Sequence, residues 1–179
     1  MKVAIIGVGT VGSAVATAIK NTGCVHEIVL YDRDGLRARA AAEDLDHAAS
    51  FGFDVKITAV SNYRGIRGSE IVIIAAGANQ KPGESRMDLL NKNAAVMRDI
   101  IPHVIANVDT KTVKIMILTN PLDVMVMLAQ KLSKIPASRV IGTGAMLDSA
   151  RLRTILSRQL GVSTQSINAY VLGEHGDSS

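Results

Sequence analysis

A glycine-rich turn between two apolar runs constrains the fold of this chain more than any other feature. The sequence GVGTVG at 7–12 follows an apolar, β-branched run at 2–7 and opens a helical pattern at 11–22. A second apolar run at 27–32 ends on Asp32, about twenty residues after the turn. A strand, a glycine turn, a helix and a second strand ending in an acidic residue form the usual dinucleotide-binding unit. The first part of the chain therefore predicts a βαβ unit with a nucleotide site.

The same alternation continues along the chain. The further strand candidates are 54–59, 70–75, 113–118 and 139–142, and the further helix candidates are 35–49, 86–107, 121–133 and 146–160. The strand candidates are continuously apolar, which is typical of parallel strands buried on both faces. Strands that alternate with helices imply right-handed crossovers. The fold class predicted is α/β, a doubly wound parallel sheet of the Rossmann type.

Composition excludes several classes of function. The chain has 179 residues, is 47% hydrophobic, and can bury a core of one domain or slightly more. Its net charge of +4 comes from dispersed lysines and arginines, with no Trp, two Phe and three Tyr, so no nucleic-acid partner is expected. The lone Cys24 excludes an internal disulfide and a cysteine-based zinc site, which fits a reducing, cytoplasmic setting. No metal is expected.

The uncharged N-terminal run imitates a targeting segment. Val3 to Ile19 carries no charge and ends in small residues, as a secretory signal does, but three glycines weaken a signal helix. The run is also too short and too rich in glycine to span a membrane. We expect neither a signal peptide nor a membrane partner.

Each glycine of the turn has a separate role in a dinucleotide site. Gly7 permits the tight turn, Gly9 lets a pyrophosphate approach the backbone, and Gly12 permits close packing of helix and strand. The helix N-terminus supplies N–H groups for the phosphates. Asp32 can accept hydrogen bonds from the adenosine ribose hydroxyls and would repel a 2′-phosphate, which favours NAD over NADP. The neighbouring Arg33 is the one residue here that could favour NADP. A purely structural glycine turn is the alternative.

Three residues near the C-terminal end suggest the chemistry. Asp148 and Arg151 are three apart in a helical pattern and so share a face, and His175 lies between glycines. Alone, the first two could be a surface ion pair and the histidine a structural group. Beside a nucleotide fold they supply a proton carrier that titrates near pH ~6.5, a carboxylate that stabilises it, and a two-pronged donor for a substrate carboxylate. This set favours hydride transfer to a 2-oxo acid.

The whole chain, from Met1 to Ser179, resembles the L-lactate dehydrogenase family of the lactate/malate dehydrogenase superfamily. The segments that carry the resemblance are GVGTVG, VLYD, AAGANQKPGESR, LTNPLDV, VIGTGAMLDSARLR and YVLGEHGDSS, in this order. The resemblance implies an NAD-binding domain at 1–143 and the N-terminal part of an α+β substrate domain at 144–179. Because relatives continue well beyond this point, we expect a fragment that lacks the second half of the pocket.

The resemblance also implies roles for individual residues. His175 is the general acid and base, Asp148 its orienting carboxylate, and Arg151 the group that grips the substrate carboxylate. Arg86, carried by the closing loop that ends beside it at 77–85, polarises the carbonyl. Asn120 hydrogen-bonds near the substrate and the nicotinamide. The other positions implied to line the cofactor, besides the glycines and Asp32, are Val11, Arg37, Tyr63, Gly77, Ala78 and Thr143.

One residue bears on the substrate. Gln80 stands where malate-specific relatives carry an arginine, so a monocarboxylic 2-oxo acid is favoured, with pyruvate and L-lactate, the glycolytic pair, as substrates. Malate, L-2-hydroxyisocaproate and a nucleotide-binding module without catalysis stay open. The resemblance implies a homo-oligomer, dimer or tetramer. Asn168 replaces the histidine that bisphosphate-activated relatives pair with the arginine at Arg153, so we expect no such activation.

Overall fold

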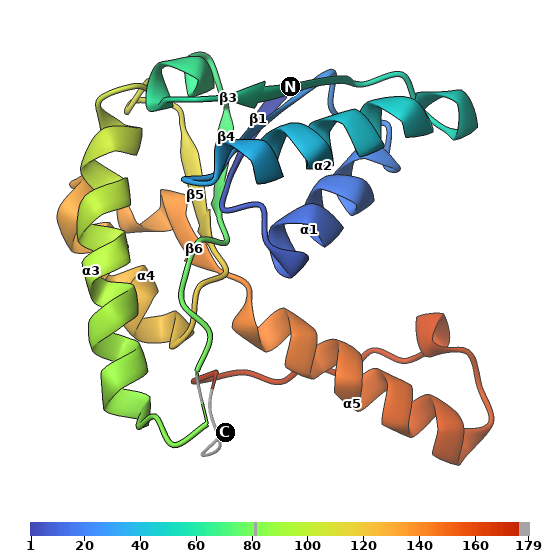
Figure 1. Ribbon diagram of the computed structural model, residues 1–179. Helices are drawn as coiled ribbons and strands as arrows, with labels where there is room; N and C mark the ends of the chain where they lie inside the picture. Colours follow the sequence, from blue (N-terminus) through green and yellow to red (C-terminus); the bar gives the residue numbers. More distant parts are fainter. Residues whose placement is uncertain (81, 176–179) are drawn as a thin grey trace.

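Six parallel strands form one sheet in the order β3-β2-β1-β4-β5-β6 (Figure 1). The computed structural model describes residues 1–80 and 82–175. The strands are β1 (Lys2–Ile6), β2 (Glu27–Tyr31), β3 (Lys56–Val60), β4 (Ile71–Ile74), β5 (Lys114–Ile117) and β6 (Val140–Gly142). Because every neighbouring pair is parallel, the carboxyl ends of all six strands lie at the same edge. The doubly wound sheet expected from the sequence is confirmed.

Helices cover both faces of the sheet. They are α1 (Thr10–Lys20), α2 (Gly35–His47), α3 (Arg86–Ile105), α4 (Leu122–Ser133) and α5 (Gly144–Leu160), with short 3₁₀ turns η1 (Ala48–Phe51), η2 (Tyr63–Ile66), η3 (Ala137–Arg139) and η4 (Thr164–Ser166). Figure 1 shows α1 and α2 on one face, α3 and α4 on the other, and α5 extending away from the sheet. The last described segment then runs back along α5.

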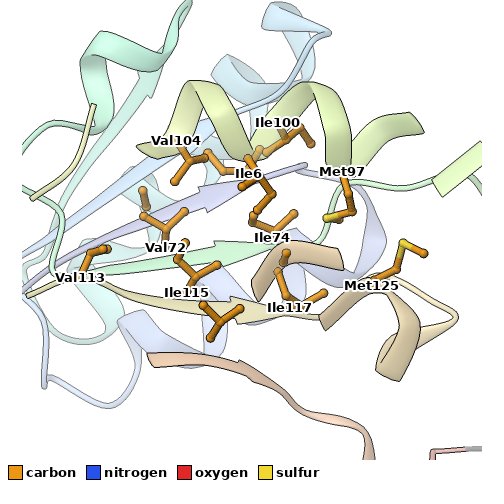
Figure 2. Close-up of a cluster of buried hydrophobic side chains, with 14 of the residues drawn as sticks. Ile6, Val72, Ile74, Met97, Ile100, Val104, Val113, Ile115, Ile117 and Met125 are labelled. Carbon is orange, nitrogen blue, oxygen red and sulfur yellow. The ribbon is translucent and has the colours of Figure 1, made fainter. Parts of the chain in front are cut away.

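Alternate residues of β1 belong to two separate apolar cores. Ala4 and Ile6 pack with side chains of α3 and α4, whereas Val3 and Ile5 pack with side chains of α1 and α2. Figure 2 shows the first core, in which Ile74 and Ile117 of the sheet lie near Met97 and Met125 of the helices. The continuous apolar strands are explained by this burial on both faces.

The predicted elements all occur, and their ends differ slightly. The predicted strands for β1, β2, β4 and β5 each run one residue past the observed strand, whereas β3 ends at Val60, one residue after its predicted end, and β6 ends at Gly142 as predicted. Helix α5 begins at Gly144, two residues before the prediction, and α3 ends at Ile105 rather than 107. The four 3₁₀ turns were not predicted.

The face of the sheet beside α1 keeps an apolar cavity of about 610 Å³. Strand residues Val3, Ile73 and Met116 line it together with Met146 and Leu147 of α5. Among the described residues, no helix is both long and apolar enough to cross a membrane.

Candidate active site

The glycine turn is closely packed on one side and open on the other. Gly7 has φ +91°, and a Cβ there would lie 2.5 Å from the backbone of Ala76. A Cβ on Gly12 would lie 2.0 Å from the carbonyl oxygen of Gly7, so α1 and the turn touch at that point. A Cβ on Gly9 would meet nothing within 4 Å. Gly9 is the N-cap of α1, so no capping side chain occupies the N–H groups of the first turn.

Asp32 lies at the end of β2 and holds the turn. It is buried, one carboxylate oxygen accepts a hydrogen bond from Val8 N–H at 2.7 Å, and the other accepts from Asp34 N–H at 2.9 Å. Each carboxylate oxygen has a second lone pair, so the group keeps acceptor capacity toward a bound hydroxyl.

A cleft of about 460 Å³ opens between the turn and α3. Seven predicted cofactor residues line it: Gly7, Gly9, Asp32, Arg37, Tyr63, Gly77 and Ala78. An open glycine, a helix N-terminus and a buried carboxylate in one cleft are groups that fit a dinucleotide with its pyrophosphate and ribose.

An aromatic group forms one wall of this cleft. The ring of Tyr63 lies 4.3 Å from that of Tyr31 and is stacked at 5.0 Å on His103. Burial, together with the neighbouring Tyr31, raises the pKa of Tyr63, so its hydroxyl stays protonated. The uncharged aromatic surface of Tyr63 suits a flat heterocycle.

Four predicted cofactor residues do not line this cleft: Asn120, Gly12, Val11 and Thr143. Gly12 lies beneath the turn, as its packing role requires. The side chain of Val11 is 54% exposed on the first turn of α1. Thr143 lines the apolar cavity beside α1 rather than the cleft.

The buried side chain of Asn93, on α3, joins the loops that follow β4 and β5. Its oxygen accepts from Ala78 N–H at 2.7 Å, and its amide donates to the carbonyls of Ala78 at 3.3 Å and Asn120 at 2.6 Å. Thr119 adds a second tie, since its hydroxyl donates to the carbonyl of Ala76 at 2.8 Å. These contacts fix the predicted cofactor residue Ala78 and the predicted substrate residue Asn120, which precedes a cis Pro121.

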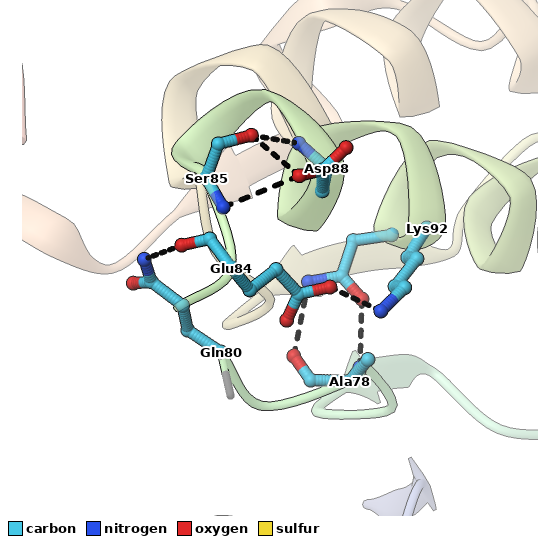
Figure 3. Close-up of polar contacts among 7 residues, drawn as sticks. Ala78, Gln80, Glu84, Ser85, Asp88 and Lys92 are labelled. Atoms are coloured by element: carbon cyan, nitrogen blue, oxygen red, sulfur yellow. Dashed lines mark hydrogen bonds and ion pairs between the residues drawn. The ribbon is translucent and has the colours of Figure 1, made fainter. Parts of the chain in front are cut away.

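Polar contacts also shape the segment between β4 and α3 (Figure 3). The amide of Gln80 donates to the carbonyl of Glu84 at 2.8 Å, and the carboxylate of Glu84 pairs with Lys92. Ser85 and Asp88 form a reciprocal capping box, whose hydrogen bonds to Ser85 hold the pKa of Asp88 below its ordinary value. Arg86 is therefore the first residue of a capped helix, not a residue of the loop itself. Residue 81 of the predicted closing loop lies outside the described residues.

His175, Asp148 and Arg151 form one polar group beside α5. The imidazole Nδ1 lies 2.6 Å from one carboxylate oxygen of Asp148, and a guanidinium nitrogen of Arg151 lies 3.2 Å from the other. The hydrogen bond with His175, followed by the charges of His175 and Arg151, holds the pKa of Asp148 below its ordinary value. An ionised carboxylate only accepts, so Nδ1 carries a proton and Nε2 is left to exchange one.

Two more residues fix the histidine. The backbone N–H of His175 donates to the carboxylate of Asp123 at 2.8 Å, and a Cβ on Gly144 would lie 2.5 Å from Cβ and Cγ of His175. Asp123, Gly144 and Asn93 were not predicted from the sequence. For Asn93 there was a signal, because a polar residue interrupts the apolar face of α3.

Comparison with known proteins identifies the family. Residues 1–142 match the family model of the lactate/malate dehydrogenase NAD-binding domain, and residues 145–179 match that of the lactate/malate dehydrogenase alpha/beta C-terminal domain. The chain belongs to the lactate/malate dehydrogenase family. The match to the family's NAD-binding domain confirms NAD as the cofactor.

Individual members of the family are similar over nearly the whole chain. The L-lactate dehydrogenase of Chloroherpeton thalassium is 43% identical over 99% of this chain and 57% of its own length, and that of Thermus aquaticus is 45% identical over 99% and 56%. The crystal structure of a minor L-lactate dehydrogenase from Enterococcus mundtii superposes with a TM-score of 0.93 at 38% identity, covering 99% of this chain and 56% of that one. The chain thus spans a little over half the length of these family members.

Proposed function

We propose that this chain carries the NAD site and the proton carrier of an L-lactate dehydrogenase, an oxidoreductase that interconverts pyruvate and L-lactate. The observation that supports it most is the 2.6 Å contact between His175 and Asp148 beside Arg151. A surface ion pair would not require a histidine held through its ring and its backbone. The names of the relatives support the same activity for the whole protein.

In this proposal, NADH supplies the hydride and the residues of the chain do the rest. Arg151 binds the substrate carboxylate with two parallel N–H donors, which fixes the orientation of the 2-oxo acid. His175 donates its Nε2 proton to the oxygen of the former carbonyl, and Asp148 stabilises the imidazolium before transfer. Arg86 places positive charge near the carbonyl oxygen, and Asn120 donates a hydrogen bond beside it.

The same scheme assigns cofactor contacts within the cleft. Gly9 and the N-terminus of α1 would hold the pyrophosphate, and Asp32 the adenosine ribose. The wall formed by Tyr63 would face the adenine, with Arg37 at its edge. Gly77 and Ala78 would lie along the nicotinamide half, with Val11 and Thr143 as further contacts.

Gln80 supports a substrate with one carboxylate. Its neutral side chain offers no countercharge to a second carboxylate, and burying such a carboxylate unpaired is costly. Pyruvate is therefore proposed over oxaloacetate, with bulkier 2-oxo acids as the nearest competitors.

The proposal includes a cytoplasmic homo-oligomer. Exposed apolar side chains on α5, including Met146, Leu147 and Ile155, support association of the chain with a further surface. Sedimentation of the purified chain at several concentrations tests this, and a monomer at all of them would contradict it.

The decisive experiment measures NADH binding by the purified chain, and NADH oxidation by the full-length protein with pyruvate, oxaloacetate and 2-oxoisocaproate in parallel. Turnover with pyruvate that is lost in His175→Asn and kept in His47→Asn, an exposed histidine of α2, is the expected result. Preference for oxaloacetate or 2-oxoisocaproate would reassign the substrate. NADH binding without turnover on any of the three would indicate a nucleotide-binding module.

A further inference from the structure

Asp123 connects the predicted proton carrier to the nucleotide-binding part of the chain. It lies in the first turn of α4, within the region that matches the NAD-binding domain. Its carboxylate accepts the backbone N–H of His175 at 2.8 Å, and His175 lies in the region that matches the C-terminal domain. The hydrogen bond therefore joins residues 52 positions apart across the boundary between the two matched regions.

The segment that carries His175 depends on such contacts. Residues 167–175 contain no helix or strand, so no ladder of backbone hydrogen bonds fixes their position. Val171 is tied to α5, since its N–H donates to the hydroxyl of Ser149 at 2.9 Å. His175 is tied to α5 as well, through Asp148.

The contacts to α5 and the contact to α4 do different things. Asp148 and Ser149 lie on the same helix, so they fix the imidazole relative to α5 alone. Hydride and proton must reach neighbouring atoms of one substrate, which demands placement within ~0.5 Å. Helix α4 packs beside β6 of the sheet. The hydrogen bond from His175 N–H to Asp123 of α4 therefore fixes the position of His175 relative to the nucleotide-binding domain.

We propose that Asp123 is a positioning residue that holds the backbone of His175 against the N-terminus of α4 and so keeps the proton carrier in register with the cofactor cleft. The proposal depends on the proposed function only for the role given to His175. Asp123 is itself exposed in the first turn of a helix, where a carboxylate is also favoured by the helix dipole. The test must therefore separate positioning from helix stability.

The test uses NMR on the whole chain, without cofactor or substrate. In Asp123→Leu, we expect amide hydrogen exchange at His175 to accelerate about tenfold or more, because its acceptor is lost. The carboxyl of Asp148 should then titrate closer to its ordinary value, because the released histidine no longer holds it. Asp123→Asn keeps an acceptor oxygen and should keep both signals near those of the unsubstituted chain.

Asp109→Leu is the matched control. Asp109 also accepts a backbone N–H, from Lys111 at 2.9 Å, in a turn before β5, so its loss tests general destabilisation. In this control, the amide exchange of His175 and the titration of Asp148 should both stay unchanged. Unprotected exchange at His175 in the unsubstituted chain, or unchanged exchange and titration in Asp123→Leu, would overturn the proposal.

If the protein oxidises NADH with a 2-oxo acid, its steady-state kinetics give a second measurement of the same effect. Asp123→Leu should lower kcat about tenfold, the loss expected for a misplaced proton donor, and leave NADH affinity within about twofold. A loss of NADH affinity with unchanged kcat would contradict positioning. The NMR signals do not require turnover. Absence of enzyme activity would therefore contradict the proposed function, whereas the role of the Asp123–His175 hydrogen bond could still be tested.

Discussion

Asp32 accepts a 2.7 Å hydrogen bond from the backbone N–H of Val8, so the residue expected to bind the ribose also holds the glycine turn in place. A second hydrogen bond, from Asp34 N–H, uses its other oxygen. The expected cofactor contact and the shape of the glycine turn therefore depend on one buried carboxylate.

Replacing this carboxylate should affect binding and stability together. Asp32→Asn has a single acceptor oxygen, and its NH₂ group would face a backbone N–H, so the free energy of unfolding should fall by about 1–3 kcal/mol. NADH affinity should fall about tenfold, equivalent to about 1.4 kcal/mol. Urea unfolding and NADH fluorescence titration measure the two effects, with the exposed Asp44→Asn of α2 as control. Unchanged values of both would contradict the assignment.

Alanine at two glycines of the turn should affect different properties, the stability of the chain at Gly12 and NADH binding at Gly9. Gly12→Ala places a Cβ 2.0 Å from the carbonyl oxygen of Gly7 and should destabilise the chain by about 1–3 kcal/mol. Gly9→Ala enters open space at an ordinary φ of −81° and should cost less than about 1 kcal/mol. It should still weaken NADH binding, because the new methyl group occupies the approach to the turn. If Gly9→Ala bound NADH as well as the parent, the pyrophosphate could not lie there.

Removal of the Asn93 amide should loosen the loops after β4 and β5. Asn93→Leu leaves a backbone N–H and two carbonyls without this partner, and we expect a loss of about 2–4 kcal/mol in the free energy of unfolding. Asn107→Leu removes an amide that donates to one exposed carbonyl, that of His103, and should cost less than about 1 kcal/mol. Chemical denaturation compares the pair, and equal losses would refute a special role for Asn93.

The contact between His175 and Asp148 should stabilise the fold in a pH-dependent way. The pKa of Asp148 is lowered on folding, so its contribution is complete above its ordinary value of 3.8 and is lost as pH falls through the lower folded value. The difference in unfolding free energy between the chain and His175→Leu should thus shrink as the pH falls from about 5 into stronger acid. Urea unfolding across this range checks the sign; a difference that grows in acid would be inconsistent with it.

Local pattern was sufficient for the architecture. The glycine turn, Asp32 and the buried strands each satisfy rules that act within about thirty residues, and the alternation of strands with helices predicts a parallel sheet but not the order of its strands. The contact between Asp148 and His175 came only from the family resemblance, because 27 residues separate them and spacing alone does not bring them together.

Side chains that bind a backbone group far along the chain were not predicted from the sequence. Asp123 reads as an ordinary carboxylate in the first turn of a helix, and its acceptor role depends on a segment 52 residues later. The family resemblance implied a closing loop that carries Arg86, whereas Arg86 begins the helix predicted at 86–107, with Ser85 and Asp88 as its capping box. Side-chain to backbone contacts over long range leave no periodic trace in a sequence.

The absence of a side chain at Gly144 leaves space for the imidazole of His175. A single methyl group at this position would occupy the volume of His175 Cβ and Cγ, so the ring could sit beside Asp148 only by moving the start of α5. A mutational scan of residue 144 should find every larger side chain deleterious to proton transfer well before it harms the sheet. The glycine at this position thereby sets how near the imidazole of His175 can come to the carboxylate of Asp148.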